Sequence, residues 1–143
     1  MRVLVTGGAG FIGSHVVARL IRSGYGVTVL DSLEKGHRAA VHPEAAFVQG
    51  DVGDGALLRD LFAETPFGAV LHFAAYIEAG ESMQVPERFY VNNTAKSLVL
   101  LEAMLEAGIR KFVFSSTAAT YGEPEVTPIG ETHPQRPTNA YGH

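Results

Sequence analysis

Three glycines at intervals of three residues follow the first apolar segment of the chain, in the run Val-Thr-Gly-Gly-Ala-Gly-Phe-Ile-Gly at residues 5–13. Gly7, Gly10 and Gly13 have the spacing GxxGxxG, and Gly8 with the last two also satisfies GxGxxG. Glycine at these positions permits a tight turn, a close approach of backbone N–H groups to a pyrophosphate, and close packing of a helix on the preceding strand. The run therefore predicts a dinucleotide-binding loop, with a glycine-rich turn that holds no ligand as the alternative.

Five short apolar segments alternate with amphipathic ones along the chain. The apolar segments lie at residues 2–6, 26–30, 45–48, 69–73 and 111–115. They are rich in β-branched and other apolar side chains without polar alternation, which is typical of strands buried on both faces. We therefore expect an α/β fold, namely a doubly wound, mostly parallel Rossmann sheet with helices on both faces that is truncated after about the fifth strand.

Two amphipathic segments predict short helices between these strands. The first helix ends near Gly24, and the second covers about residues 55–64. In the first helix, the residues expected on the side that faces the sheet are Ile12, Val16, Leu20 and Ile21.

A third and longer helix is predicted from about residue 86 to residue 107. Its apolar residues form two stripes: Val91, Thr94, Leu98, Leu101 and Leu105 on one side, and Leu100, Ala103, Met104 and Ala107 on roughly the opposite side. Because only one stripe can cover the sheet, the other needs a second covering surface. We expect a homo-oligomer contact along this helix, with a later segment of the chain as the alternative.

Composition limits the class of protein. The length of 143 residues suits one domain, here expected to be a dinucleotide-binding domain over residues 1–143. The six histidines are scattered and cysteine is absent, so we expect no metal site. The net charge of −4, with acids and bases interspersed, predicts no nucleic-acid partner. The N-terminal apolar run is too short for a signal peptide or a membrane span, so we expect a cytoplasmic protein without a membrane partner.

Asp31 follows the second predicted strand, eighteen residues after Gly13. A carboxylate at this position can accept hydrogen bonds from both hydroxyls of an adenosine ribose and can repel a 2′-phosphate, which favours NAD over NADP. The alternative is an aspartate that caps the following turn. Lys35 and Arg38 come soon after it and keep NADP open.

Polar and small residues also follow the third and fourth strands. Asp51 can bond to the amino group of an adenine and Val52 can pack on its ring, although a turn or helix-cap role fits Asp51 equally well. Phe73, Ala74 and Ala75 leave the fourth strand where a cofactor would cross the carboxyl edge of the sheet, and small side chains there permit a close approach.

Hydroxyl and amide groups complete the set of candidates. Ser115 closes the fifth strand, with Thr117 just beyond it, and Tyr141 lies in the run Asn-Ala-Tyr-Gly-His. Taken alone, strand-end hydroxyls and a single tyrosine are common in any protein. Asn92 and Asn93 lie inside the long predicted helix, where an amide side chain usually points outward.

Considered together, these segments resemble the N-terminal part of the extended short-chain dehydrogenase/reductase family, most closely its UDP-glucose 4-epimerase branch. The resemblance covers the whole chain in the family's order and spacing. The segments that carry it are TGGAGFIGSH (6–15), VLDSLEKGHR (29–38), GDVGD (50–54), HFAAYIEAGES (72–82), YVNN (90–93), FVFSSTAATYGEPE (112–125) and NAYGH (139–143).

The resemblance implies NAD as a retained cofactor and a UDP-hexose as the substrate. The implied reaction is oxidation at C4 of the hexose by bound NAD, rotation of the 4-keto sugar, and return of the hydride to its other face. Thr117 and Tyr141 match the family's catalytic residues. The implied cofactor-binding residues are Gly7, Gly10, Phe11, Ile12, Gly13, Asp31, Asp51, Val52, Phe73, Ala74, Ala75, Asn93 and Ser115.

The sequence departs from the family pattern at three places. Ile77 occupies a position where epimerases commonly have a cofactor-contacting lysine, and Thr94-Ala95-Lys96 replaces a run that usually contains more glycine. The family's YxxxK motif requires a lysine at position 145, beyond His143. That lysine helps to lower the pKa of the tyrosine, which is about 10 for an unperturbed phenol. We therefore expect the isolated chain to be inactive or impaired.

Two further functions remain open from the sequence. One is a non-catalytic module that binds a dinucleotide. The other is the N-terminal part of a different nucleotide-sugar enzyme, such as a dehydratase, a decarboxylase or a reductase. Ala118 and Ala119 follow Thr117, where 4,6-dehydratases of the family usually have acidic residues, and this favours an epimerase.

Overall fold

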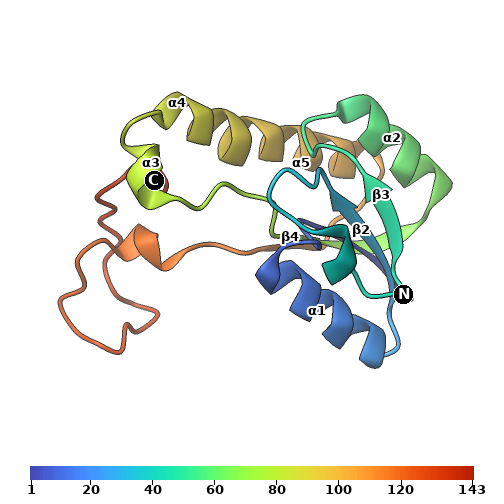
Figure 1. The fold of residues 1–143 in the computed structure, drawn as a ribbon, viewed down its shortest axis with the longest axis horizontal. Helices are drawn as coiled ribbons and strands as arrows, with labels where there is room; N and C mark the ends of the chain where they lie inside the picture. Colours follow the sequence, from blue (N-terminus) through green and yellow to red (C-terminus); the bar gives the residue numbers. More distant parts are fainter.

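A five-stranded parallel sheet forms the centre of the molecule in the computed structural model, which describes residues 1–143 (Figure 1). The strands are β1 (Arg2–Thr6), β2 (Gly26–Asp31), β3 (Ala46–Gln49), β4 (Phe67–His72) and β5 (Phe112–Phe114). Their order is β3-β2-β1-β4-β5 and every neighbouring pair is parallel, which confirms the predicted Rossmann-type sheet. The chain moves outward from β1 to β3 and then crosses to β4, so the switch of direction falls between β1 and β4.

Helix α1 (Phe11–Arg22) covers one face of the sheet (Figure 1). Its predicted core side was wrong at Ile12, whose side chain is 59% exposed, whereas Val17 is fully buried. Phe11 and Ile12 in the first turn of α1 are exposed, and Gly13, the first buried residue of the helix, packs closely on Gly7 and Gly8 of the glycine loop. The buried stripe therefore begins one residue later, and Leu20 and Ile21 pack partly against it as expected.

Helix α2 (Gly55–Glu64) lies on the opposite face and has the predicted bounds. Asp54 begins it, because its side chain accepts hydrogen bonds from the N–H groups of Ala56 and Leu57 at 3.1 and 3.0 Å. Leu58, Leu61 and Phe62 then turn inward and join the larger of the two apolar clusters of the core.

The long helix forms in three consecutive parts: α4 (Pro86–Phe89), a π-helical turn (Tyr90–Ala95) and α5 (Lys96–Glu106). It follows the short helix α3 (Ala79–Ser82) and lies beside α2 (Figure 1). Leu100, Ala103 and Met104 are buried against the sheet, as predicted for one stripe. Ala107 does not share that burial, because it ends the helix in an exposed turn.

The second predicted stripe of this helix is covered only at Leu101, which packs against the larger apolar cluster of the core. Val91, Leu98 and Leu105 are 56%, 60% and 56% exposed.

No helix of the molecule combines the length and the apolar character needed to cross a membrane.

A buried chain of hydrogen bonds connects β1, β4 and α5. The Ser97 hydroxyl donates to the carbonyl oxygen of Asn93 at 2.7 Å, so its oxygen accepts from Nε2 of His72 at 2.9 Å. Nδ1 of His72 therefore accepts from the Thr6 hydroxyl at 2.6 Å. Burial lowers the pKa of His72 to about 4, and the ring is neutral at pH 7.

Beyond β5 the chain leaves the sheet, forms a 3-10 turn (Ala118–Tyr121), and returns to α3 (Figure 1). There the backbone N–H of Tyr141 donates to the fully buried hydroxyl of Ser82 at 3.1 Å. This contact brings the last residues of the chain to the edge of the sheet where the strands end.

Candidate functional site

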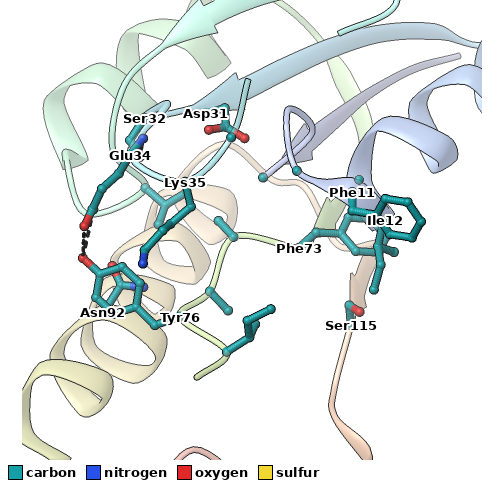
Figure 2. Close-up of a pocket in the computed structure, with 18 of the residues that line it drawn as sticks. Phe11, Ile12, Asp31, Ser32, Glu34, Lys35, Phe73, Tyr76, Asn92 and Ser115 are labelled. Carbon is teal, nitrogen blue, oxygen red and sulfur yellow. Dashed lines mark hydrogen bonds between the residues drawn. The ribbon is translucent and has the colours of Figure 1, made fainter. Parts of the chain in front are cut away.

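A pocket of about 400 Å³ lies at the carboxyl edge of the sheet, where the loops after all five strands meet (Figure 2). Parallel sheets of this topology bind ligands at that edge, close to the switch of strand order. The residues predicted from the sequence that line it are Gly7, Gly10, Phe11, Ile12, Gly13, Asp31, Asp51, Val52, Phe73, Ala74, Ala75, Ser115 and Tyr141. Asn93 and Thr117 lie outside its lining.

The glycine loop has the shape of a phosphate cradle. Gly7 has φ +70°, and a Cβ atom there would lie 2.5 Å from the backbone nitrogen of Ala74. A Cβ atom at Gly13 would overlap the carbonyl oxygen of Gly7, so α1 can cross the loop closely only with glycine at this position. Gly10 is the N-cap of α1 and brings no side chain to the helix end, which leaves the first N–H groups open to an anion.

Gly8 is buried and does not line the pocket. A Cβ atom there would lie 2.8 Å from the methyl groups of Val29 in β2. Of the two glycine patterns in the sequence, the one that faces the pocket is therefore Gly7, Gly10 and Gly13.

Asp31 joins two loops of the pocket and lines it. Its Oδ2 accepts from the N–H of Ala9 in the glycine loop, and its Oδ1 accepts from the N–H of Leu33, both at 2.9 Å. The side chain caps the turn that follows β2, as the alternative interpretation predicted, and it also lies at the pocket wall. The carboxylate is 8% exposed, so its remaining lone pairs face the pocket or the protein interior.

Asp51 combines a turn with an ion pair. Its Oδ1 accepts from the N–H of Gly53 at 2.7 Å, and its Oδ2 accepts from the ammonium group of Lys96 at 2.5 Å. Partial burial works to raise the pKa of Asp51, but the hydrogen bonds from Lys96 and Gly53 outweigh it and the pKa lies below its usual value. Lys96, one of the departures from the family pattern, thus holds a pocket carboxylate in its charged form.

Asn93 lies outside the pocket lining and forms hydrogen bonds with Tyr76, which lines the pocket. Its side-chain amide accepts from the N–H of Tyr76 and donates to the carbonyl oxygen of Tyr76, each at 2.9 Å. Asn92 lines the pocket and donates to the Asn93 oxygen at 3.0 Å. An asparagine inside a helix usually points outward. The amide of Asn93 instead points toward the loop after β4.

Polar and charged side chains connect the loop after β2 with the loop after β4, and Figure 2 shows the contact between Glu34 and Tyr76. Lys35 donates to Glu78 at 3.1 Å, and the Tyr76 hydroxyl donates to both oxygens of Glu34 at 2.9 Å. Arg88 of α4 also donates to Glu34, at 3.3 Å. The hydrogen bond and charge of Glu78 raise the pKa of Lys35, and the hydrogen bond from Lys35 lowers that of Glu78.

The two residues predicted to be catalytic lie in one region of the structure. Thr117 begins the 3-10 turn, where its oxygen accepts from the N–H of Ala119 at 3.1 Å. Tyr141 lines the pocket, and a Cβ atom at the next residue, Gly142, would lie 2.5 Å from the carbonyl oxygen of Ala119. The two segments therefore pack together beside the pocket, with Ser115 and Ser116 in its lining.

With this geometry in place, comparison with known proteins identifies the family. Residues 3–143 match the NAD dependent epimerase/dehydratase family. The chain belongs to this family. It is 56% identical over 144 residues to the UDP-glucose 4-epimerase of Streptococcus mutans and 47% identical over 149 residues to UDP-arabinose 4-epimerase 1 of Arabidopsis thaliana. These matches cover 99% and 98% of this chain, but only 43% and 36% of the relatives.

Solved epimerase structures have the same fold. The UDP-glucose 4-epimerase of Brucella ovis in complex with NAD matches with a TM-score of 0.94 and 44% identity over 99% of this chain and 43% of that one. The enzyme of Bifidobacterium longum in complex with NAD+ and UDP matches with a TM-score of 0.94 and 39% identity over 99% of this chain and 45% of that one. The family and the Rossmann fold predicted from the sequence are thereby confirmed.

Sequence reasoning missed part of the pocket of this family member. The lining residues that it did not discuss are Leu30, Ser32, Glu34, Gly36, Gly50, Tyr76, Glu78 and Ser116. Most lie in the two loops that directly follow Asp31 and Ala75. The only sequence signal for these residues was their position directly after a predicted strand. Parallel strands end at one edge of the sheet, so every loop that follows a strand can contribute residues to a pocket there.

Proposed function

We propose that this chain is the NAD-binding part of a UDP-glucose 4-epimerase type of enzyme. The observation that carries the proposal is the pocket at the sheet edge, which gathers an open helix N-terminus, a glycine cradle and a buried aspartate. A dinucleotide needs these three features for its pyrophosphate and its adenosine ribose. The similar epimerases crystallised with NAD support the choice of ligand.

Each wall of the pocket has a part in this proposal. The N-terminus of α1 with Gly7 and Gly13 holds the pyrophosphate, and Asp31 accepts from the ribose hydroxyls. Asp51 and Val52 contact the adenine, and the small side chains of residues 73–75 permit the dinucleotide to lie across the ends of the strands. Lys96 supports this arrangement because it keeps Asp51 charged.

The proposed substrate is a UDP-hexose that is epimerised at C4. NAD supplies reversible hydride transfer at that carbon when bound. Tyr141 removes the proton from the 4-hydroxyl group, and the hydroxyl of Thr117 donates to the same oxygen. In the structure Thr117 uses its oxygen as an acceptor for Ala119, so its own O–H remains free to donate.

A second copy of the chain is the proposed partner of the exposed stripe Val91, Leu98 and Leu105. These residues form a row on one helix, and a two-fold axis would bring the same row of both copies together. A cytoplasmic location, expected from an N-terminal apolar run too short for a signal peptide or a membrane span, stays a prediction.

The proposal is tested by titration of the purified chain with NAD, beside an assay for conversion of UDP-galactose to UDP-glucose. We expect NAD to bind, and Tyr141→Phe to leave NAD binding intact while it abolishes any turnover. A chain that does not bind NAD would contradict the proposal. Because the isolated chain is expected to be inactive or impaired, any turnover should be weak, and turnover that Tyr141→Phe leaves unchanged would contradict the catalytic role of Tyr141.

A further inference from the structure

The charged side chains that line the pocket are mostly acidic. Four carboxylates line it, and Lys35 is its single cationic side chain; the carboxylates belong to Asp31, Glu34, Asp51 and Glu78. A nucleotide with an additional phosphate would depend on this one ammonium group for charge compensation, because Arg or Lys accommodates the 2′-phosphate of NADP in related folds.

Lys35 stands directly beside the aspartate that marks the ribose position. Gly36, the next residue, packs so closely that a Cβ atom there would lie 2.9 Å from Oδ1 of Asp31. The N–H of His37 then donates to the carbonyl oxygen of Ala9 at 3.0 Å, which fixes the loop against the glycine loop. Figure 2 shows the Lys35 side chain extending from this loop into the pocket, between Asp31 and Tyr76.

The ammonium group of Lys35 already has a partner across the pocket. It donates to Oε1 of Glu78 at 3.1 Å, and Oε2 of Glu78 accepts from the N–H of Ile77 at 3.1 Å, which orients the carboxylate. At neutral pH both members of the pair are charged, so Glu78 cancels the charge of Lys35 at the place where a 2′-phosphate would need it.

The other nearby cations are also engaged. The Arg38 guanidinium lies over the ring of Phe47, 4.4 Å from its centroid, and outside the pocket lining. Arg88 bonds to Glu34 and Glu81 at 3.3 and 2.6 Å. Of the cations that the sequence offers to a 2′-phosphate, Lys35 is therefore the one that lines the pocket.

We infer that Glu78 is a specificity-determining residue that weakens NADP binding by pairing with Lys35 across the ribose end of the pocket. This inference rests on the proposed dinucleotide-binding function. The Asp31 carboxylate repels a 2′-phosphate, and Glu78 neutralises Lys35, the one cationic side chain of the pocket that could attract it. Loss of the Glu78 charge would leave Lys35 free to bind that phosphate, whereas NAD has no group there and would be little affected.

The test is titration of the full chain with NAD+ and with NADP+ in parallel, for the wild type, Glu78→Gln, Lys35→Met and the double variant. We expect Glu78→Gln to tighten NADP+ binding about fivefold, the range of one exposed charge interaction, with NAD+ changed less than about twofold. The gain should disappear in the double variant and shrink at about 0.5 M salt, because screening acts on charges.

Glu125→Gln is the matched control, because Glu125 forms an exposed ion pair of similar length with Arg136, 2.9 Å, outside the pocket. It should leave both affinities unchanged. An unchanged NADP+ to NAD+ ratio in Glu78→Gln would overturn the inference, and so would a gain that persists without Lys35. A wild-type chain that fails to bind NAD+ would overturn the proposed function and this inference with it.

Discussion

The side chain of Asn93 and the backbone of Tyr76 form a two-point hydrogen-bonded pair, with both bonds 2.9 Å long. Asn93 lies in the π-helical turn of the long helix, and Tyr76 lies in the loop that lines the pocket. The pair therefore holds the loop at Tyr76 in a fixed position relative to the long helix. It gives Asn93 a clear role although its side chain is not in the pocket lining.

Asn93→Ala should loosen the loop after β4 and weaken NAD binding severalfold. It removes both partners of the Tyr76 backbone, and the loss of two hydrogen bonds corresponds to about 1–3 kcal/mol of folding free energy. Urea unfolding and titration with NAD measure the two effects. Asn92→Ala is the control, since Asn92 donates to the Asn93 oxygen and makes no bond to Tyr76. Equal losses in both variants would contradict a specific role for Asn93.

The stability of the protein should depend on pH through His72. Burial lowers the pKa of His72 from 6.5 to about 4, so between these values the unfolded chain binds a proton that the folded chain does not. The contribution of the neutral ring is complete above pH 6.5 and is lost as the pH falls toward 4, by about 3 kcal/mol in total.

His72→Asn should flatten this part of the stability curve. The measurement is the free energy of unfolding in urea between pH 4 and 7, compared with the wild type and with a variant of the exposed His37, His37→Asn. The His37 variant should keep the wild-type slope. The explanation fails if His72→Asn keeps it too.

Gly13→Ala should destabilise the fold by about 2 kcal/mol or more and abolish NAD binding, because the added methyl group overlaps the Gly7 carbonyl oxygen. Gly80→Ala is the matched control within α3, where a Cβ atom would meet no atom within 4 Å. Thermal unfolding and NAD titration compare the two. A well-folded Gly13→Ala chain that binds NAD normally would show that the close crossing of α1 is not required.

Leu98→Lys should shift the chain toward the monomer if a second copy covers the exposed stripe. Leu98 is 60% exposed on the long helix, and a charge at the centre of an apolar contact is costly. Light scattering coupled to size exclusion gives the mass as a function of concentration. Val126→Lys, at a residue that is 67% exposed elsewhere, should change nothing. A wild-type chain that is monomeric at high concentration would contradict the proposed contact.

The sequence predicted the parts of the fold that depend on local periodicity. The first strand and helix α2 have the expected bounds, because glycine, aspartate and charged residues bracket each apolar segment. It failed at Ile12, which has helical spacing with the core residues but lies in the exposed first turn of α1 and lines the pocket. The π-helical turn at residues 90–95 was also missed, because periodicity alone does not distinguish it from an α-helical turn.

Within the site, the sequence located residues whose type reflects a backbone requirement, such as Gly7 and Gly13. It could not locate Glu78 or Tyr76, because their roles come from contacts with residues about forty positions earlier in the chain. Lys96 was visible only as a departure from the family pattern. Its contact with Asp51 depends on how α5 packs beside the end of β3, which is a tertiary relationship.

The buried chain that joins Thr6, His72 and Ser97 runs in a single direction, with each hydroxyl proton committed to the next acceptor. Replacement of any one member by an apolar residue would leave a polar group of its neighbour buried without a hydrogen-bond partner. This would lower the free energy of unfolding enough to be selected against. The three positions should therefore evolve as a unit. Relatives that lose the histidine are expected to lose the paired hydroxyls as well, and this correlated substitution would be visible in an alignment.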